Sequence, residues 1–199
     1  MSISYIPLGF FVKLFTGLDD LAITIPLVSG MGFNKTRPRQ LAFALGIFLA
    51  ATVAVLFAIF FSSFIQQFKY FKEITATLLF VLATAIYFRL LEKYTKRKVE
   101  KSVERMKKAK MDGKLFQIFS ISFIAFLISS SDDVIAYFPL FLAGTSNIYY
   151  ASMGIFAAVI VEIIAAIYLA EKINKFKNKN EITSLILVIL GILVLSGVI

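Results

Sequence analysis

Six long apolar segments, separated by charged loops, constrain the fold of this chain more than any other feature. They span residues 3–28, 41–64, 70–91, 115–143, 149–169 and 182–199. A helix needs about 20 apolar residues to cross the hydrocarbon core of a bilayer, and the segments are close to this length or longer. They lack the alternating pattern of outer-membrane β-strands. We therefore expect an all-α integral membrane protein, with six transmembrane helices forming one domain in the lipid bilayer.

Two aspartate doublets lie near the middle of the first and fourth segments. Asp19 and Asp20 are followed by five uncharged residues and then Pro-Leu, and Asp132 and Asp133 are followed by the same pattern. A carboxylate at the centre of a bilayer costs roughly 2.5–3.5 kcal/mol even on insertion scales. Such residues usually serve a function or pair with another group, so the doublets are the first candidate site.

The doublets belong to a longer internal repeat. The tripeptide Gly-Ile-Phe recurs in segments two and five, and Glu-Ile-Thr recurs at the start of segments three and six. An odd number of helices in each copy gives the copies opposite orientations, as in many secondary transporters. We expect two inverted three-helix repeats with the site between them. The divisions are repeat one at 1–91, a basic linker at 92–114 and repeat two at 115–199.

The loop charges predict the topology. The loops after segments one, three and five carry 17 Lys and Arg residues, whereas the opposite loops carry only Lys69 and Lys72. Basic loops stay in the cytoplasm. We therefore expect a multi-pass plasma-membrane protein with both termini outside. The net charge of +9 follows from this topology, so we do not expect nucleic-acid binding.

The residues around the doublets favour broken helices and oxygen ligands. Gly17 and the serines 129–131 precede the doublets, and Pro26 and Pro139 follow them. Gly, Ser and Pro favour kinks or new helix starts, so helices one and four are candidates for breaks at the doublets. The chain contains no Cys and no His. Carboxylate oxygens are the ligands of hard cations. The predicted metal ligands are Asp19, Asp20, Asp132 and Asp133, with no ranking within a doublet.

Three further residues are auxiliary candidates. Glu162 lies inside segment five where the first repeat has Ala54, so it is a candidate proton carrier or fifth ligand. Lys13 lies seven residues before Asp20, on nearly the same helical face. The alternative for Lys13 is an ion pair with Asp20 or Glu162, or a side chain that extends to the membrane surface. The Ser131 hydroxyl is a candidate hydrogen-bond partner for whichever aspartate of a doublet does not bind the metal.

The whole chain resembles the cadmium-resistance transporter family of the lysine-exporter superfamily. The shared features are the first-helix doublet, the basic linker and residues 132–141, which read Asp-Asp-Val-Ile-Ala-Tyr-Phe-Pro-Leu-Phe. In that family the second motif tends to read Gly-x-Asp-Asn. Here Asp132 matches the Asp, Ser131 replaces the small residue, and Asp133 adds a carboxylate where Asn is usual. The resemblance implies cation export, and wider relatives export manganese, calcium or amino acids.

These observations predict a secondary transporter that exports a divalent cation of the Cd, Mn or Ca class. We expect it to work by alternating access and to be coupled to protons. The cation would be the transported substrate and not a resident cofactor. A homodimer is a possible assembly. The first alternative is an exporter of a cationic amino acid or related metabolite. Others are an intramembrane Asp-dependent enzyme, which we do not expect, and a structural membrane protein in which the doublets form a polar clamp between helices.

Overall fold

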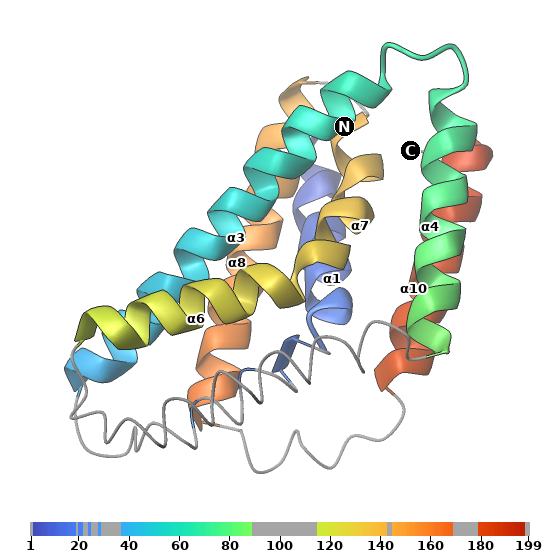
Figure 1. The fold of residues 1–199 in the computed structure, drawn as a ribbon. Helices are drawn as coiled ribbons and strands as arrows, with labels where there is room; N and C mark the ends of the chain where they lie inside the picture. The colour runs from blue at the N-terminus through green and yellow to red at the C-terminus, as the bar shows by residue number, and fades with distance from the viewer. Residues whose placement is uncertain are drawn as a thin grey trace.

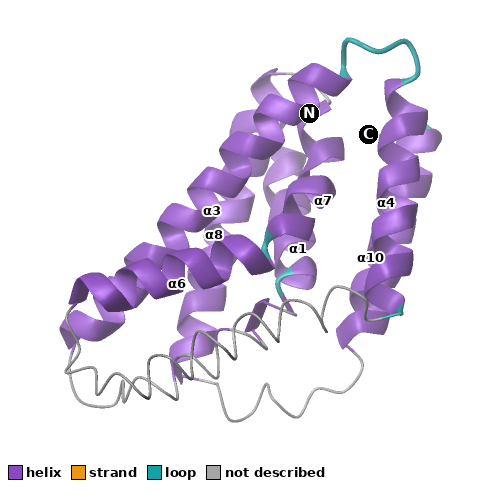
Figure 2. Ribbon diagram, in the orientation of Figure 1, coloured by secondary structure: helices purple, strands orange, loops and turns teal. Residues whose placement is uncertain are grey.

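The computed structural model is all-helical in the part of the chain that it describes. It describes residues 2–18, 20–21, 24, 28, 37–88, 115–142, 145–168 and 179–197. Asp19, Pro26 and the predicted linker 92–114 lie outside these residues. A short 3-10 helix at Ser2–Ser4 precedes the α-helices. These are α1 (Tyr5–Thr16), α3 (Arg37–Ile65), α4 (Phe71–Tyr87), α6 (Leu115–Ser129), α7 (Ser131–Leu142), α8 (Thr145–Tyr168) and α10 (Lys179–Leu195). Figure 2 shows helices joined by loops, with no strand in the described ranges.

Two helices are long and apolar enough to cross a membrane. They are α3 and the stretch Asn147–Tyr168 of α8, and the bent pair α6–α7 is a third if it counts as one span. The α1 helix and Thr183–Leu195 of α10 are apolar but shorter. The 29 residues of α3 extend about 44 Å, more than the roughly 30 Å hydrocarbon core, whereas the 12 residues of α1 extend about 18 Å. The expectation of apolar membrane-compatible helices is therefore confirmed at the level of two or three spans among the described residues.

The distribution of polarity differs from that of a water-soluble protein. Large apolar side chains are exposed along the outer faces of the long helices, including Leu56 and Phe60 of α3 and Met153 and Ile164 of α8. Charged and hydroxyl side chains are buried inside the bundle, among them one lysine, three described aspartates and one glutamate. Water does not favour an apolar exterior of this extent, whereas lipid does.

Three helix pairs hold the bundle together: α1 with α8, α3 with α6, and α4 with α10. Figure 1 shows α7 and α1 near the centre, and α4 beside α10 at one edge. Glycines allow the first two pairs to approach closely. A Cβ atom on Gly154 of α8 would collide with the Ile6 carbonyl of α1, and one on Gly46 of α3 would collide with Ser122 of α6. The two Gly-Ile-Phe echoes therefore mark close helix contacts, as small residues do in membrane bundles.

Both helices that carry the doublets are interrupted there. The α6 and α7 helices meet at an angle of 62° around Ser130. The hydroxyls of Ser129 and Ser130 both donate to the Phe126 carbonyl, at 3.1 and 2.8 Å, and serine bonds of this kind bend helices. In the first segment, α1 ends at Thr16, with Gly17 as its C-cap. The predicted break is therefore observed in segment four, and α1 ends where the break in segment one was expected.

Candidate cation-binding site

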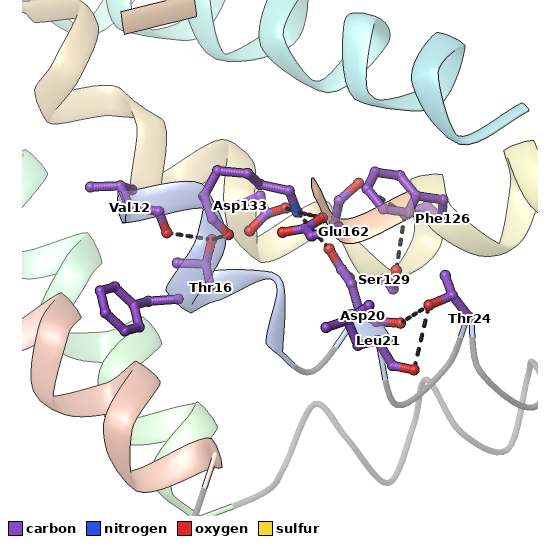
Figure 3. A network of polar contacts seen from close by, with 12 residues as sticks. Val12, Thr16, Asp20, Leu21, Thr24, Phe126, Ser129, Asp133 and Glu162 are labelled. Atoms are coloured by element: carbon purple, nitrogen blue, oxygen red, sulfur yellow. Dashed lines mark hydrogen bonds and ion pairs between the residues drawn. The ribbon is translucent and has the colours of Figure 1, made fainter. Parts of the chain in front are cut away.

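The centre of the site is the ammonium group of Lys13, which is completely buried. Its Nζ atom lies 2.6 Å from Asp133 Oδ2, 2.8 Å from Asp20 Oδ2 and 3.3 Å from Glu162 Oε2. Figure 3 shows the three carboxylates converging from different elements. Asp20 follows α1, Asp133 belongs to α7 and Glu162 belongs to α8. Lys13 and these three carboxylates thus form one buried ion-pair cluster.

The helix ends place these charges favourably. Lys13 lies in the last turn of α1, where the partial negative charge of the helix C-terminus stabilises a cation. Asp133 lies in the first turn of α7, where the partial positive charge of the N-terminus stabilises an anion. The breaks in the two segments therefore bring a helix C-terminus and a helix N-terminus, each with its complementary charge, to one point inside the bundle.

An aromatic ring forms one wall of the site. The Lys13 ammonium lies 5.0 Å from the centroid of the Phe126 ring, within the range of a cation–π interaction. Phe126 occupies the position in the second repeat that corresponds to Lys13 in the first. Phe126 was not among the residues predicted for the site, although its equivalence to Lys13 in the repeat places it beside the second doublet.

Not all carboxylate oxygens of the cluster are used by described groups. Asp133 Oδ1 and Glu162 Oε1 are buried and have no hydrogen-bond partner among the described residues. Glu162 packs directly against Gly17, where an added Cβ would collide with its carboxylate. A buried carboxylate oxygen without a partner loses solvation without compensation, so these atoms are positioned to accept a further cation or proton.

The four groups in contact do not balance in charge. One ammonium faces three carboxylates, which leaves two negative charges if all four groups are ionised. Two unbalanced charges in a buried site are costly. One divalent cation or two protons would cancel them.

The structure distinguishes the members of the predicted set. Asp20 and Asp133, the second residue of each doublet, contact Lys13. The alternative for Lys13, an ion pair with Asp20 or Glu162, is what the structure shows, and both carboxylates are in contact with it. Asp132 is buried in the same turn as Asp133, and Asp19 lies outside the described residues. Ser131 is exposed and donates to the Ile128 carbonyl at 3.1 Å, so it is occupied outside the ion-pair cluster.

Hydroxyl groups also satisfy the backbone where the helices are interrupted. Thr183 of α10 donates to the Phe15 carbonyl at 2.8 Å, and Ser131 donates to the Ile128 carbonyl. Phe15 and Ile128 occupy equivalent positions of the two repeats. Thr183, which sequence analysis did not assign to the site, belongs to the repeated Glu-Ile-Thr motif. The motif thus contributes a bond that holds the end of α1.

In the part of the chain that the structure describes, no three Cys, His, Asp or Glu residues are arranged to hold a metal ion. The Lys13 ammonium lies between the carboxylates that would have to converge on one. The assignment of Asp19, Asp20, Asp132 and Asp133 as metal ligands therefore stays a prediction. Comparisons of this chain with protein-family models, with curated proteins and with solved structures give no match.

Proposed function

We propose that this protein is a secondary transporter that exports a divalent metal cation through the Asp20–Asp133–Glu162 site. The observation that carries the proposal is the convergence of three buried carboxylates on one cation in a bundle with an apolar exterior. The excess of two negative charges matches one divalent ion, or two protons in its place, and so supports proton-coupled exchange. Oxygen ligands suit Mn²⁺ and Ca²⁺, and Cd²⁺ is close to Ca²⁺ in size.

The helix pairing supports an inverted repeat with six spans. If segments one, two and three correspond to four, five and six, then the pairing of α1 with α8 corresponds to that of α6 with α3. The pairing of α4 with α10 corresponds to itself. A two-fold axis between the halves produces such an exchange, and transporters built this way bind substrate between the repeats. A short α1 that ends inside the bundle, beside the ion-pair cluster, fits the same proposal.

The arrangement of the helix ends supports the proposed topology. Both termini lie at the end of the bundle that carries the α3–α4 loop (Figure 1). The helix ends that flank the three basic loops lie at the opposite end. With the basic loops in the cytoplasm, both termini are outside the cell. The resemblance to the cadmium-resistance transporter family agrees with this proposal.

A second candidate substrate is a cationic amino acid or related metabolite. The ion that the cluster holds is the primary ammonium of Lys13, with a phenylalanine ring beside it. The same groups would accept a free alkylammonium. Flux of lysine or a diamine that is unaffected by divalent metals would favour this candidate.

The test is cation binding and flux of the purified protein in proteoliposomes. We expect Mn²⁺, Ca²⁺ or Cd²⁺ to raise the thermal stability of the wild type, by about 2.7 kcal/mol at a hundred times the dissociation constant. The Asp20→Asn/Asp133→Asn variant should lose this effect together with flux. Glu73→Gln is the matched control, because Glu73 is exposed at the start of α4. Equal binding and flux in both variants would contradict the proposal.

A further inference from the structure

We propose that Lys13 competes with the transported cation for the aspartates. Its ammonium occupies the aspartates when cargo is absent and must leave them for cargo to bind. The inference rests on the proposed function and assigns a coupling role to a residue of the same site. On this proposal the unloaded carrier returns with its own ammonium at the cargo position, and the two protons of the proposed exchange balance the remaining charge.

The geometry makes the ammonium and a metal ion mutually exclusive. Lys13 Nζ lies 2.6 and 2.8 Å from the Oδ2 atoms of Asp133 and Asp20. Calcium lies about 2.3–2.6 Å from its oxygen ligands. A metal that bridged these two oxygens would therefore lie almost where the nitrogen lies, and two cations cannot share that position.

Glu162 provides a second place for the ammonium. It is the third carboxylate around Lys13, at 3.3 Å, and its Oε1 atom has no hydrogen-bond partner among the described residues. The flexible lysine stem allows Nζ to move towards Glu162 without a change of backbone. Lys13 and Glu162 would then form a neutral pair, and Asp20 with Asp133 would balance one divalent cation.

The asymmetry of the site supports this division. Asp20 and Asp133 are equivalent in the two repeats, whereas Lys13 corresponds to Phe126 and Glu162 corresponds to Ala54. Lys13 and Glu162, whose equivalents in the other repeat are uncharged, thus contact each other. The equivalent pair supplies the cargo ligands, and the asymmetric pair supplies the competitor and the carboxylate that receives it.

The experiment compares Mn²⁺ binding and transport in wild type and Lys13→Met, which keeps most of the side-chain volume and removes the charge. We expect the dissociation constant for Mn²⁺ to fall at least tenfold in Lys13→Met. Net Mn²⁺ efflux should fall at least tenfold, because without Lys13 the emptied site must return with one more uncompensated negative charge. Exchange of Mn²⁺ for Mn²⁺ across the membrane should persist, because it needs no unloaded return.

Chemical rescue separates competition from a merely structural role. Lys13→Ala leaves space for methylammonium beside Phe126. Added methylammonium should weaken Mn²⁺ binding to this variant and restore part of its net efflux, and it should do neither in wild type. A structural lysine would predict recovery of thermal stability without any change in Mn²⁺ affinity.

The outcomes distinguish this inference from the proposed function. Absence of divalent-cation binding and flux in wild type would overturn the proposed function itself. Binding and flux in wild type, with unchanged or weaker Mn²⁺ binding in Lys13→Met, would overturn only the competitor role. If Lys13→Met does not fold, Lys13→Met/Glu162→Gln removes the pair as a unit. That variant should also bind Mn²⁺ at least tenfold more tightly than wild type, and equal affinity would overturn the inference.

Discussion

At the scale of single residues, the site depends on contacts that leave little room. Glu162 reaches the Lys13 ammonium across the end of α1, and Gly17 is the residue over which its carboxylate passes. The absence of a side chain at position 17 therefore has two effects. It ends α1 beside the doublet, and it leaves space for the carboxylate of Glu162. The other repeat has Ala54 at the position equivalent to Glu162.

Gly17→Ala should disturb the site through Glu162. The new Cβ would overlap the Glu162 carboxylate, so that side chain must shift away from Lys13. We expect a loss of stability of about 1–3 kcal/mol, the usual cost of overpacking, together with weaker cation binding. Thermal unfolding and Mn²⁺ titration measure both effects.

A double-mutant cycle identifies the cause. In a Glu162→Ala background the carboxylate is gone, so adding Gly17→Ala should cost less than half of what it costs in wild type. An equal cost in both backgrounds would show that backbone conformation at Gly17, rather than contact with Glu162, determines the effect.

At the scale of helices, packing of small residues controls how the elements that carry the site meet. Gly154 lets α8, which carries Glu162, approach α1, which carries Lys13. Gly46 does the same for α3 and α6, and α6 leads to the bend before Asp133. Distances near 3 Å between charged groups on different helices require these close approaches.

Gly154→Val and Gly46→Val should each destabilise the protein by about 1–3 kcal/mol, because the neighbouring atoms at both sites include backbone that cannot move aside. Met153→Val and Leu45→Val are matched controls, since each replaces the exposed residue immediately before the glycine. Thermal unfolding in detergent measures the four variants. Destabilisation by the controls as large as that by the glycine variants would contradict close packing at these positions.

Part of this element-scale arrangement is predictable from sequence. The seven-residue spacing of Lys13 and Asp20 predicts that the two side chains lie close, and they do so although α1 ends between them. The serines 129–131 predict the bend before Asp133. Which aspartate of the second doublet contacts Lys13 is not predictable from sequence. Both residues are buried, but adjacent helical residues point about 100° apart, and tertiary packing decides which one contacts Lys13. The contacts of Glu162 with Gly17 and of Lys13 with Phe126 also join distant elements, so no local pattern specifies them.

At the scale of the whole molecule, the proposed function requires that the two ends of the bundle face different compartments. The termini and the α3–α4 loop share one end in Figure 1, and the helix ends beside the basic loops share the other. Alternating access requires a site between two such ends. If both ends of the bundle faced the same compartment, the same ion pairs would only hold the helices together.

Cysteine labelling tests this arrangement directly, because the chain contains no native Cys and each introduced thiol is unique. Tyr70→Cys, at an exposed position before α4, should react with a membrane-impermeant maleimide on intact cells. Ser102→Cys, in the strongly basic stretch 92–114, should react only after the membrane is permeabilised. A cysteine appended to either terminus should behave like Tyr70→Cys. In the six-span topology three spans separate each terminus from residue 102, which puts the termini on the opposite side from it. Six spans separate the two termini, which puts them on the same side. Labelling of both Tyr70→Cys and Ser102→Cys from outside would contradict that topology, and with it the passage of cations between the two ends. The predicted pattern would leave the carboxylate cluster between the two compartments, where a cation carrier needs it.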